Sequence, residues 1–413
     1  MNRETIRIIL IFSFLLYHAF EWYLDYLDTK HMNAEIPENV RDVYNEEEYR
    51  KWVSYHKENM RFSLAESLVS FLAGLLMLVF NFYALVFSAF SGRSLYLQYF
   101  LMILLLAVIE TVIAIPFRYY ETFVIEEKYG MNKTSKKTFV LDTLKKWVIG
   151  VVLEYGLVVL IMFLYERFGD PGIVLICAAF ILISLLVSLI VVPLMRIFNK
   201  FAPLEDEELR QQLLVLCEKY GIEVKKIVIR DASRRTTRAN AFCTGLTKKK
   251  TISLDDNLVK DYENDQIVAV FAHEFAHAKF SHILKSMPFS LAQTVLTIAM
   301  LGVVFHITPA FTAFGFDGLN YYFALSLLTL FTWPLAQVLA LVANRISRRH
   351  EYEADAFAAR EGYGEALISA LKKLNKDSLS NLNPHPLIVD LEYSHPTLSQ
   401  RIEAIRENEN AGA

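Results

Sequence analysis

Phe-Ala-His-Glu-Phe-Ala-His, at residues 271–277, places the pattern His-Glu-x-x-His inside an apolar, alanine-rich run. The apolar residues recur with helical periodicity, and side chains four apart lie on nearly the same face of an α-helix. His273 and His277 can therefore direct their imidazoles at one metal ion, with Glu274 beside them. A catalytic zinc takes three protein ligands and keeps one position for water, so we expect a third ligand elsewhere in the chain.

A second helix-forming stretch, Arg-Arg-His-Glu-Tyr-Glu-Ala-Asp-Ala-Phe-Ala at residues 348–358, follows the last apolar run. Glu351 and Asp355 lie four apart on one helical face. We expect Glu351 to be the third zinc ligand and Asp355 to accept the second ring N–H of a ligating histidine. Glu353 falls on another face and is the weaker candidate. Each histidine alone could be an ordinary, partly buried residue, but the combined pattern favours a metal site.

The composition indicates a membrane protein. Of the 413 residues, 54% are hydrophobic, which is unusual for a soluble domain. The formal net charge of −3 argues against a general nucleic-acid-binding protein.

Seven apolar runs are long enough to cross about 30 Å of hydrocarbon. They cover residues 6–24, 62–90, 96–117, 147–165, 172–197, 287–311 and 321–343. Pro116 predicts the end of the third run, and the short segment 166–171 makes the fourth and fifth antiparallel neighbours.

An odd number of spans puts the two termini on opposite sides of the membrane. The first, third and fifth loops are rich in Lys and Arg, whereas the second contains only Arg93, the fourth only Arg167 and the sixth neither. Because such an excess marks cytoplasmic loops, we expect the histidine motif and the C-terminus to face the cytoplasm. Arg3 and Arg7 oppose this assignment.

Four ionisable residues, Glu66, Glu110, Glu154 and His306, fall inside the apolar runs. Such residues rarely face lipid, so they indicate a polar interior. A water-filled chamber and a tight bundle with paired glutamates would both explain them.

The segment 199–286 has the composition of a soluble domain. We expect a helix over Leu204–Tyr220 and strands over Lys226–Ile229, Ala241–Leu246 and Thr251–Leu254, the last two joined by the turn 247–250. The residues Glu-Asn-Asp at 263–265 indicate the start of the motif helix. A small sheet therefore directly precedes that helix.

His-Glu-x-x-His followed by Glu-x-x-Ala-Asp in a multispanning chain resembles the M48 gluzincins, and more narrowly their CAAX prenyl protease 1 branch. Four further stretches are similar to that branch, so the resemblance spans most of the chain. They are Phe-Val-Ile-Glu-Glu-Lys-Tyr-Gly-Met-Asn at 123–132, Arg-Ala-Asn-Ala-Phe at 238–242, Ala-Leu-Lys-Lys-Leu-Asn-Lys-Asp at 370–377 and Ser-His-Pro-Thr-Leu-Ser-Gln-Arg-Ile at 394–402.

The resemblance implies a mainly α fold, in which a barrel of seven membrane helices encloses a chamber and a gluzincin-type zinc protease domain with a small β-sheet caps it. We expect four parts: an N-terminal membrane region of five spans at 1–198, with polar loops at 25–61 and 118–146; a zinc protease domain at 199–286; spans six and seven at 287–343; and the C-terminal part of the protease domain at 344–413.

The expected activity is that of a zinc metalloendopeptidase with one Zn²⁺ per chain, in which Glu274 is the general base. The resemblance implies that it removes the last three residues of prenylated Cys-a-a-X proteins. His395 is the candidate oxyanion donor, and the resemblance supports it and Arg401 as substrate-site residues; a helix-entry turn with a structural ion pair is the alternative. Asn240 could pair with an extended substrate at a strand edge, or could be a turn asparagine.

Two other functions remain open at this point. A bacterial quality-control metalloprotease would need no prenyl group on its protein substrate. A channel or transporter would use the intramembrane glutamates to line a path. The corresponding membranes are the bacterial cytoplasmic membrane and the eukaryotic endoplasmic reticulum, with the lipid bilayer as a partner in either.

Overall fold

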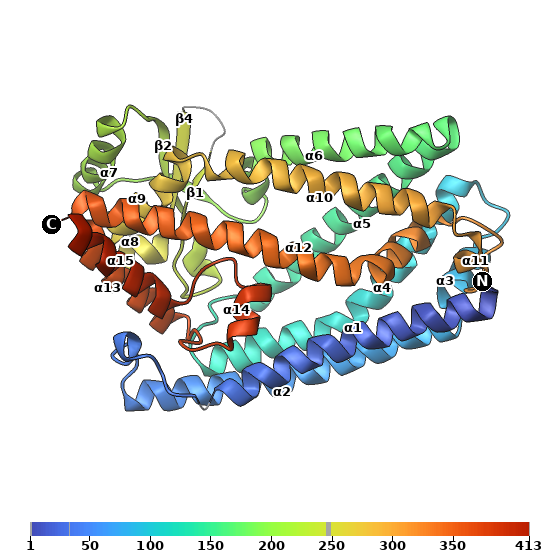
Figure 1. The fold of residues 1–413 in the computed structure, drawn as a ribbon, viewed down its shortest axis with the longest axis horizontal. Helices are drawn as coiled ribbons and strands as arrows, with labels where there is room; N and C mark the ends of the chain where they lie inside the picture. The colour runs from blue at the N-terminus through green and yellow to red at the C-terminus, as the bar shows by residue number, and fades with distance from the viewer. Residues whose placement is uncertain (1, 33, 245–248, 413) are drawn as a thin grey trace.

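The chain is mainly helical, with one small sheet at one end. The computed structural model describes residues 2–32, 34–244 and 249–412. Within them, seven helices are long and apolar enough to cross a membrane, as predicted. The N- and C-termini lie at opposite ends of the long axis (Figure 1). The sheet and the C-terminal helices gather at the end that carries the C-terminus.

The seven long helices form a closed ring. They are α1 (Arg3–His31), α2 (Glu46–Val79), α4 (Leu95–Tyr120), α5 (Lys136–Phe168), α6 (Pro171–Met195), α10 (His282–Phe305) and α12 (Tyr321–Ala358). Helix α1 contacts α2 and α12, α12 contacts α10, α10 contacts α6, α6 contacts α5, and α5 contacts α4. The π-helix η2 (Glu121–Glu126) continues α4 and contacts α2, which completes the ring.

Shorter helices join the long ones or build the domain at the C-terminal end. They are η1 (Glu38–Val40), α3 (Phe82–Ala89), α7 (Glu207–Lys219), η3 (Ala232–Arg234), α8 (Asp256–Asp261), α9 (Asn264–Lys279), α11 (Thr308–Thr312), η4 (Ala359–Tyr363), α13 (Gly364–Asp377), α14 (Pro386–Glu392) and α15 (Leu398–Gly412).

Three details of the predicted spans are wrong. The run 62–90 is not one helix, because Asn81 takes a left-handed conformation with φ of 55° and separates α2 from α3. Pro116 does not end the third span: it lies inside α4, which loses one backbone hydrogen bond there and still continues to Tyr120. His306 does not lie within a span, because α10 ends at Phe305 and the His306 ring lies 3.1 Å from Asp170.

The sheet has four strands in the order β1-β2-β4-β3. These are β1 (Phe201–Pro203), β2 (Glu223–Arg230), β3 (Ala241–Thr244) and β4 (Lys249–Asp255), with β2 and β4 parallel and the other pairs antiparallel. The sequence did not predict β1, a three-residue edge strand that ends in a proline, which an edge tolerates. The end of the strand predicted over Ala241–Leu246 and the start of the turn predicted at 247–250 fall on residues 245–248, which lie outside the described part of the chain.

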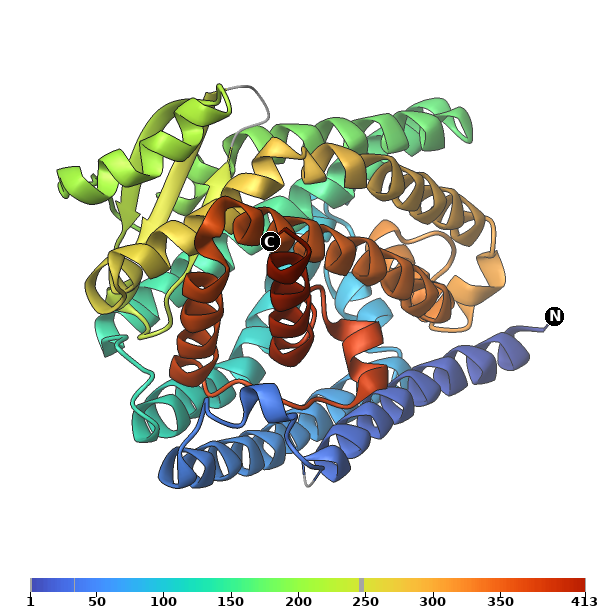
Figure 2. The same ribbon diagram turned by 60° about the vertical axis from the view of Figure 1, so that its left-hand side comes forward.

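Two of the expected part boundaries fall inside continuous helices. The boundary at 286/287 lies in α10, and that at 343/344 lies in α12. Helix α12 has 38 residues and is about 57 Å long at 1.5 Å per residue. It therefore runs from the membrane ring into the C-terminal domain without interruption (Figures 1 and 2).

The close approach of α5 and α6 predicts a strict size limit at Gly172. A Cβ atom there would lie 2.4 Å from the backbone oxygen of Leu164, which cannot move aside as a side chain can. We expect Gly172→Ala to destabilise the protein by about 1–3 kcal/mol, the usual cost of overpacking. Thermal unfolding in detergent measures this.

The matched control is Gly150→Ala on α5, where an added Cβ meets no atom within 4 Å. A Gly172→Ala protein that unfolds at the same temperature as the Gly150→Ala protein would contradict the packing argument.

Candidate metal centre

Helix α9 carries the His-Glu-x-x-His motif and is one of the most buried helices of the C-terminal domain. A capping box between Glu263 and Gln266 fixes its start, as the sequence predicted. Its apolar side chains, among them Phe271 and Phe275, are buried against neighbouring helices and the sheet. This burial holds the helix rigidly and leaves one polar face, on which the two histidines of the motif lie.

The structure brings His273, His277 and Glu351 together. One nitrogen from each histidine and one carboxylate oxygen all lie within 4.8 Å of one another. The two Nε2 atoms are 3.1 Å apart, and each lies 3.3 Å from an oxygen of Glu351. Two histidines and a glutamate are the ligand set of a known class of catalytic zinc site.

One atom of this group indicates that a cation fits here. The Oε2 atom of Glu351 is buried and accepts no hydrogen bond among the described residues, although Nε2 of His273 lies 3.3 Å and Nη1 of Arg401 3.8 Å from it. An ionised oxygen that accepts no hydrogen bond is costly in a protein interior. A metal ion bound between the imidazoles would satisfy it, so the residues present fit zinc.

Asp355 orients the first histidine. Its Oδ1 lies 2.8 Å from Nδ1 of His273, which therefore carries the proton and leaves Nε2 free for a metal. Arg401 donates to both Asp355 oxygens, from Nε at 2.8 Å and from Nη2 at 2.6 Å. Asp355 and Arg401 are both buried, so the pair holds the imidazole in a dry environment.

Glu274 directly follows His273 in the motif, so its carboxylate could act on a water molecule at this group. Burial raises the pKa of its carboxyl group, while His273 and His277 oppose this shift. Its carboxylate makes no hydrogen bond or ion pair within the residues that the structure describes. A raised pKa suits a group that must accept a proton near neutral pH.

His395 and Arg401 line a cavity of about 450 Å³ next to this group. Nε2 of His395 lies 3.6 Å from Glu351, and partial desolvation of the ring within the cavity lowers its pKa, which favours the neutral form. Arg401 donates to Asp355, its Nη2 also lies 3.2 Å from Nδ1 of His273, and its Nη1 lies 3.8 Å from Glu351. Residues from α1, α2 and the loop before β3, including Arg238, line the other side of the cavity.

Asn240 directly precedes β3, which is an edge strand and contacts α9. Its side chain is exposed, and its Oδ1 accepts from the backbone N–H of Ala241. Asn240 does not line the cavity that contains His395.

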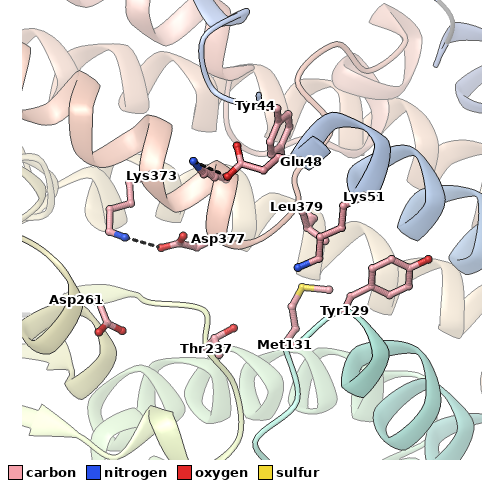
Figure 3. Close-up of a pocket in the computed structure, with 12 residues that line it drawn as sticks. Tyr44, Glu48, Lys51, Tyr129, Met131, Thr237, Asp261, Lys373, Asp377 and Leu379 are labelled. Carbon is pink, nitrogen blue, oxygen red and sulfur yellow. Dashed lines mark ion pairs between the residues drawn. The ribbon is translucent and has the colours of Figure 1, made fainter. Parts of the chain in front are cut away.

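A second cavity of about 490 Å³ lies between α2 and α13 and contains none of the metal-site residues (Figure 3). Two ion pairs, Lys373 with Asp377 and Lys376 with Glu48, are formed entirely between residues that line this cavity. Chemistry at the metal centre therefore belongs to the cavity next to His395.

The sequence did not predict one further contact of the centre. Nδ1 of His282 lies 2.8 Å from Nδ1 of His277. A spacing of five residues does not bring two side chains together on a continuous helix. Here the helix is interrupted at Ser281, between α9 and α10.

Comparison with known proteins gives consistent matches along the chain. Residues 25–200 match the family model described as CAAX prenyl protease N-terminal, five membrane helices, and residues 203–409 match Peptidase family M48. CAAX prenyl protease 1 of Saccharomyces cerevisiae is 30% identical, over 94% of this chain and 92% of the relative. A CAAX prenyl protease 1 homolog of Arabidopsis thaliana is 36% identical, over 70% and 69%.

A solved structure shows the same fold. The crystal structure of S. mikatae Ste24p superposes with a TM-score of 0.90 at 28% sequence identity, and the match covers 97% of this chain and 99% of that one.

The electrostatics of the centre predict that zinc binding releases a proton. Burial and the charge of Arg401 lower the pKa of His273. The interactions with Asp355 and Glu351 raise it by more, and the net pKa is about 9. The metal-free imidazole is therefore protonated at pH 7, and zinc must displace that proton. We expect the apparent zinc affinity to rise about tenfold per pH unit up to about pH 8.5 and then to level off.

Chelator competition at several pH values measures this, and calorimetry in buffers of different ionisation enthalpy counts the proton. An affinity that stays constant from pH 6.5 to 8.5 would show that His273 is already neutral without metal.

Proposed function

The chain belongs to peptidase family M48 as a membrane metalloprotease of the CAAX prenyl protease 1 type, and we propose that it removes the last three residues of prenylated Cys-a-a-X proteins. The observation that carries this proposal is the group of His273, His277 and Glu351, with Glu274 beside it, where the helical ring meets the C-terminal domain.

We assign His273, His277 and Glu351 as the ligands of one zinc ion per chain. Zinc there supplies a Lewis acid that lowers the pKa of water and polarises the scissile carbonyl. Glu274 accepts a proton from the attacking water and delivers it to the leaving amine. Its raised pKa and its free carboxylate support this role.

His395 is our candidate donor to the developing oxyanion. Its ring is exposed to the cavity, and Ser394 Oγ lies 2.9 Å from its Nδ1. If Ser394 accepts from Nδ1, however, Nε2 carries no proton in the neutral ring. A donating role therefore needs Nδ1 to accept from the Ser394 hydroxyl, which leaves the proton on Nε2. We propose that Asp355 and Arg401 fix His273, and that Arg401 also contacts substrate where it lines the cavity.

The substrate peptide would lie extended along the β3 edge. An edge strand presents unpaired backbone groups that an added strand can use. Asn240 lies at the start of this edge, and β3 contacts the motif helix α9. This placement supports a peptide that runs past Asn240 toward the metal centre, with its C-terminal residues in the cavity next to His395.

We propose that the ring of spans encloses a wet chamber. Glu110 on α4 is exposed, although it interacts with Glu154 on α5 and with Tyr83 and Tyr322. Glu66 on α2 interacts with Glu121. Glu66 and Glu154 are half-buried and Glu110 is exposed, and carboxylates that stay accessible among neighbouring helices support a hollow interior over a tight bundle.

The positive loops support an orientation with the metal centre and C-terminus in the cytoplasm. The opposite placement of the two termini in Figure 1 agrees with seven crossings. Cytoplasmic prenylated proteins would then reach the site in the endoplasmic reticulum membrane. In the bacterial cytoplasmic membrane, the same orientation would serve general quality control of membrane proteins.

The quality-control function is the alternative that we retain. The exposed edge strand and the cavity accept any extended peptide and do not by themselves require a lipid. Membership of a peptidase family decides against the channel or transporter interpretation.

Replacing the proposed general base tests the mechanism directly. We expect Glu274→Gln to lower kcat by about 10²–10⁴-fold, because the amide cannot accept the proton, while stoichiometric zinc is retained. Peptide hydrolysis and metal analysis of the same preparation measure both effects. The control is Glu208→Gln on the exposed face of α7. Full activity in Glu274→Gln would remove Glu274 from the mechanism.

A pair of peptides tests the prenyl requirement. Both end in Cys-a-a-X; one carries a farnesyl thioether and the other an S-methyl group. We expect kcat/KM to be at least about tenfold higher for the farnesylated peptide, since each buried CH₂ contributes about 0.8 kcal/mol. Equal values would favour the quality-control function.

A further inference from the structure

We propose that His282 and Glu353 are positioning residues, which together fix the tautomer and ring orientation of the metal ligand His277. This inference rests on the proposed function, because it takes His277 as a zinc ligand. It concerns the side of the site away from Asp355 and Arg401, where no orienting group was expected.

The hydrogen bonds run in one direction through three side chains. When Nε2 of His277 faces a metal, Nδ1 carries the proton and donates to Nδ1 of His282, 2.8 Å away. The proton of His282 must then be on Nε2, which lies 3.2 Å from Oε2 of Glu353. This series of hydrogen bonds thus ends on a carboxylate, as does the hydrogen bond from His273 to Asp355.

The neighbouring residues hold His282 and Glu353 in place. His282 is buried, and its ring stacks on that of His350 with centroids 4.2 Å apart and planes 3° from parallel. Lys285 donates to Glu353 at 3.1 Å, and Arg349 pairs with its other oxygen at 3.4 Å. These cations keep the Glu353 carboxylate charged and directed at His282.

The backbone between the two histidines is shaped for this contact. Ser281 takes a left-handed conformation with φ of 55°, which residues other than glycine rarely adopt. The resulting turn ends α9 and starts α10 at His282. It brings the His282 ring back against His277, which a continuous helix would not do.

The test is the zinc dissociation constant of the full-length protein in detergent, measured by chelator competition. His282→Phe fills the same space without an acceptor, and we expect it to bind zinc about 10–100-fold more weakly, the usual effect of losing an outer partner. His282→Asn offers an amide oxygen near the position of Nδ1, and we expect it to recover most of that loss. Glu353→Gln leaves the ring packing unchanged and should give a smaller weakening.

The matched control is His350→Phe, which preserves the stack on His282; the His350 side chain makes no hydrogen bond or ion pair with His273, His277 or Glu351 among the described residues, so the zinc affinity should stay within about threefold of the wild type. Thermal unfolding of each metal-free variant separates misfolding from loss of affinity. The visible spectrum of the Co²⁺-substituted protein reports ligand geometry, and we expect it to change in His282→Phe and not in His350→Phe.

Wild-type affinity in folded His282→Phe, with an unchanged Co²⁺ spectrum, would overturn this inference and leave the proposed function standing. If His282→Phe does not fold, wild-type affinity in Glu353→Gln, with an unchanged Co²⁺ spectrum, overturns it equally. If the His277→Ala variant binds zinc as tightly as the wild type, the proposed metal site itself is refuted.

Discussion

The buried carboxylate of Asp355 is the constraint on which the metal centre depends. It is enclosed between His273 and Arg401, which lie 82 and 46 residues away in the chain. A buried charge is tolerated only when it is paired, and removing one partner of a buried ion pair typically costs 3–5 kcal/mol. Asp355 therefore holds α9, α12 and α15 in one fixed arrangement. That arrangement also determines where the Nε2 atom of His273 can point.

The continuity of α12 transmits this arrangement to the membrane ring. The helix begins at Tyr321, among the aromatic residues at the far end of the ring, and it carries Glu351 and Asp355 near its other end. Because no loop intervenes, the carboxylate of Glu351, which we propose as a zinc ligand, cannot move independently of the seventh span. The chain then turns through η4, where Gly362 has φ of 86°, and α13 packs back onto α9. Helix α9 is thus packed against both α12 and α13.

The sequence predicted the parts of the site that depend on one helix at a time. His273 with His277, and Glu351 with Asp355, are each four apart, and this spacing alone places each pair on one face. Apolar runs likewise located seven spans, because hydropathy reports burial in lipid directly. Nothing in either pattern gives the distance between α9 and α12, so the metal group itself required the folded structure.

The failures have local physical causes. Asn81 and Ser281 are left-handed residues without the glycine that usually indicates such a break, so the ends of α2 and α9 were not visible. Pro116 breaks helices in water, but inside an apolar span the backbone has no solvent to bond to and remains helical. The contact of His282 with His277 was missed for the same reason as the break at Ser281. Residue spacing describes a helix only as far as the helix continues.

His273 and His277, which we propose as zinc ligands, are held from different parts of the molecule, and this difference links the membrane ring to the metal centre. His273 is held by Arg401 through Asp355, from the C-terminal helix α15. His277 contacts His282 at the start of α10, and His282 contacts Glu353 on α12; both helices belong to the ring. A shift of α10 against α12 therefore disturbs the contact between His282 and Glu353, and a shift of α12 carries Glu351 with it. The metal centre thus depends on the packing of the ring, and the catalytic domain and the membrane helices form one mechanical unit.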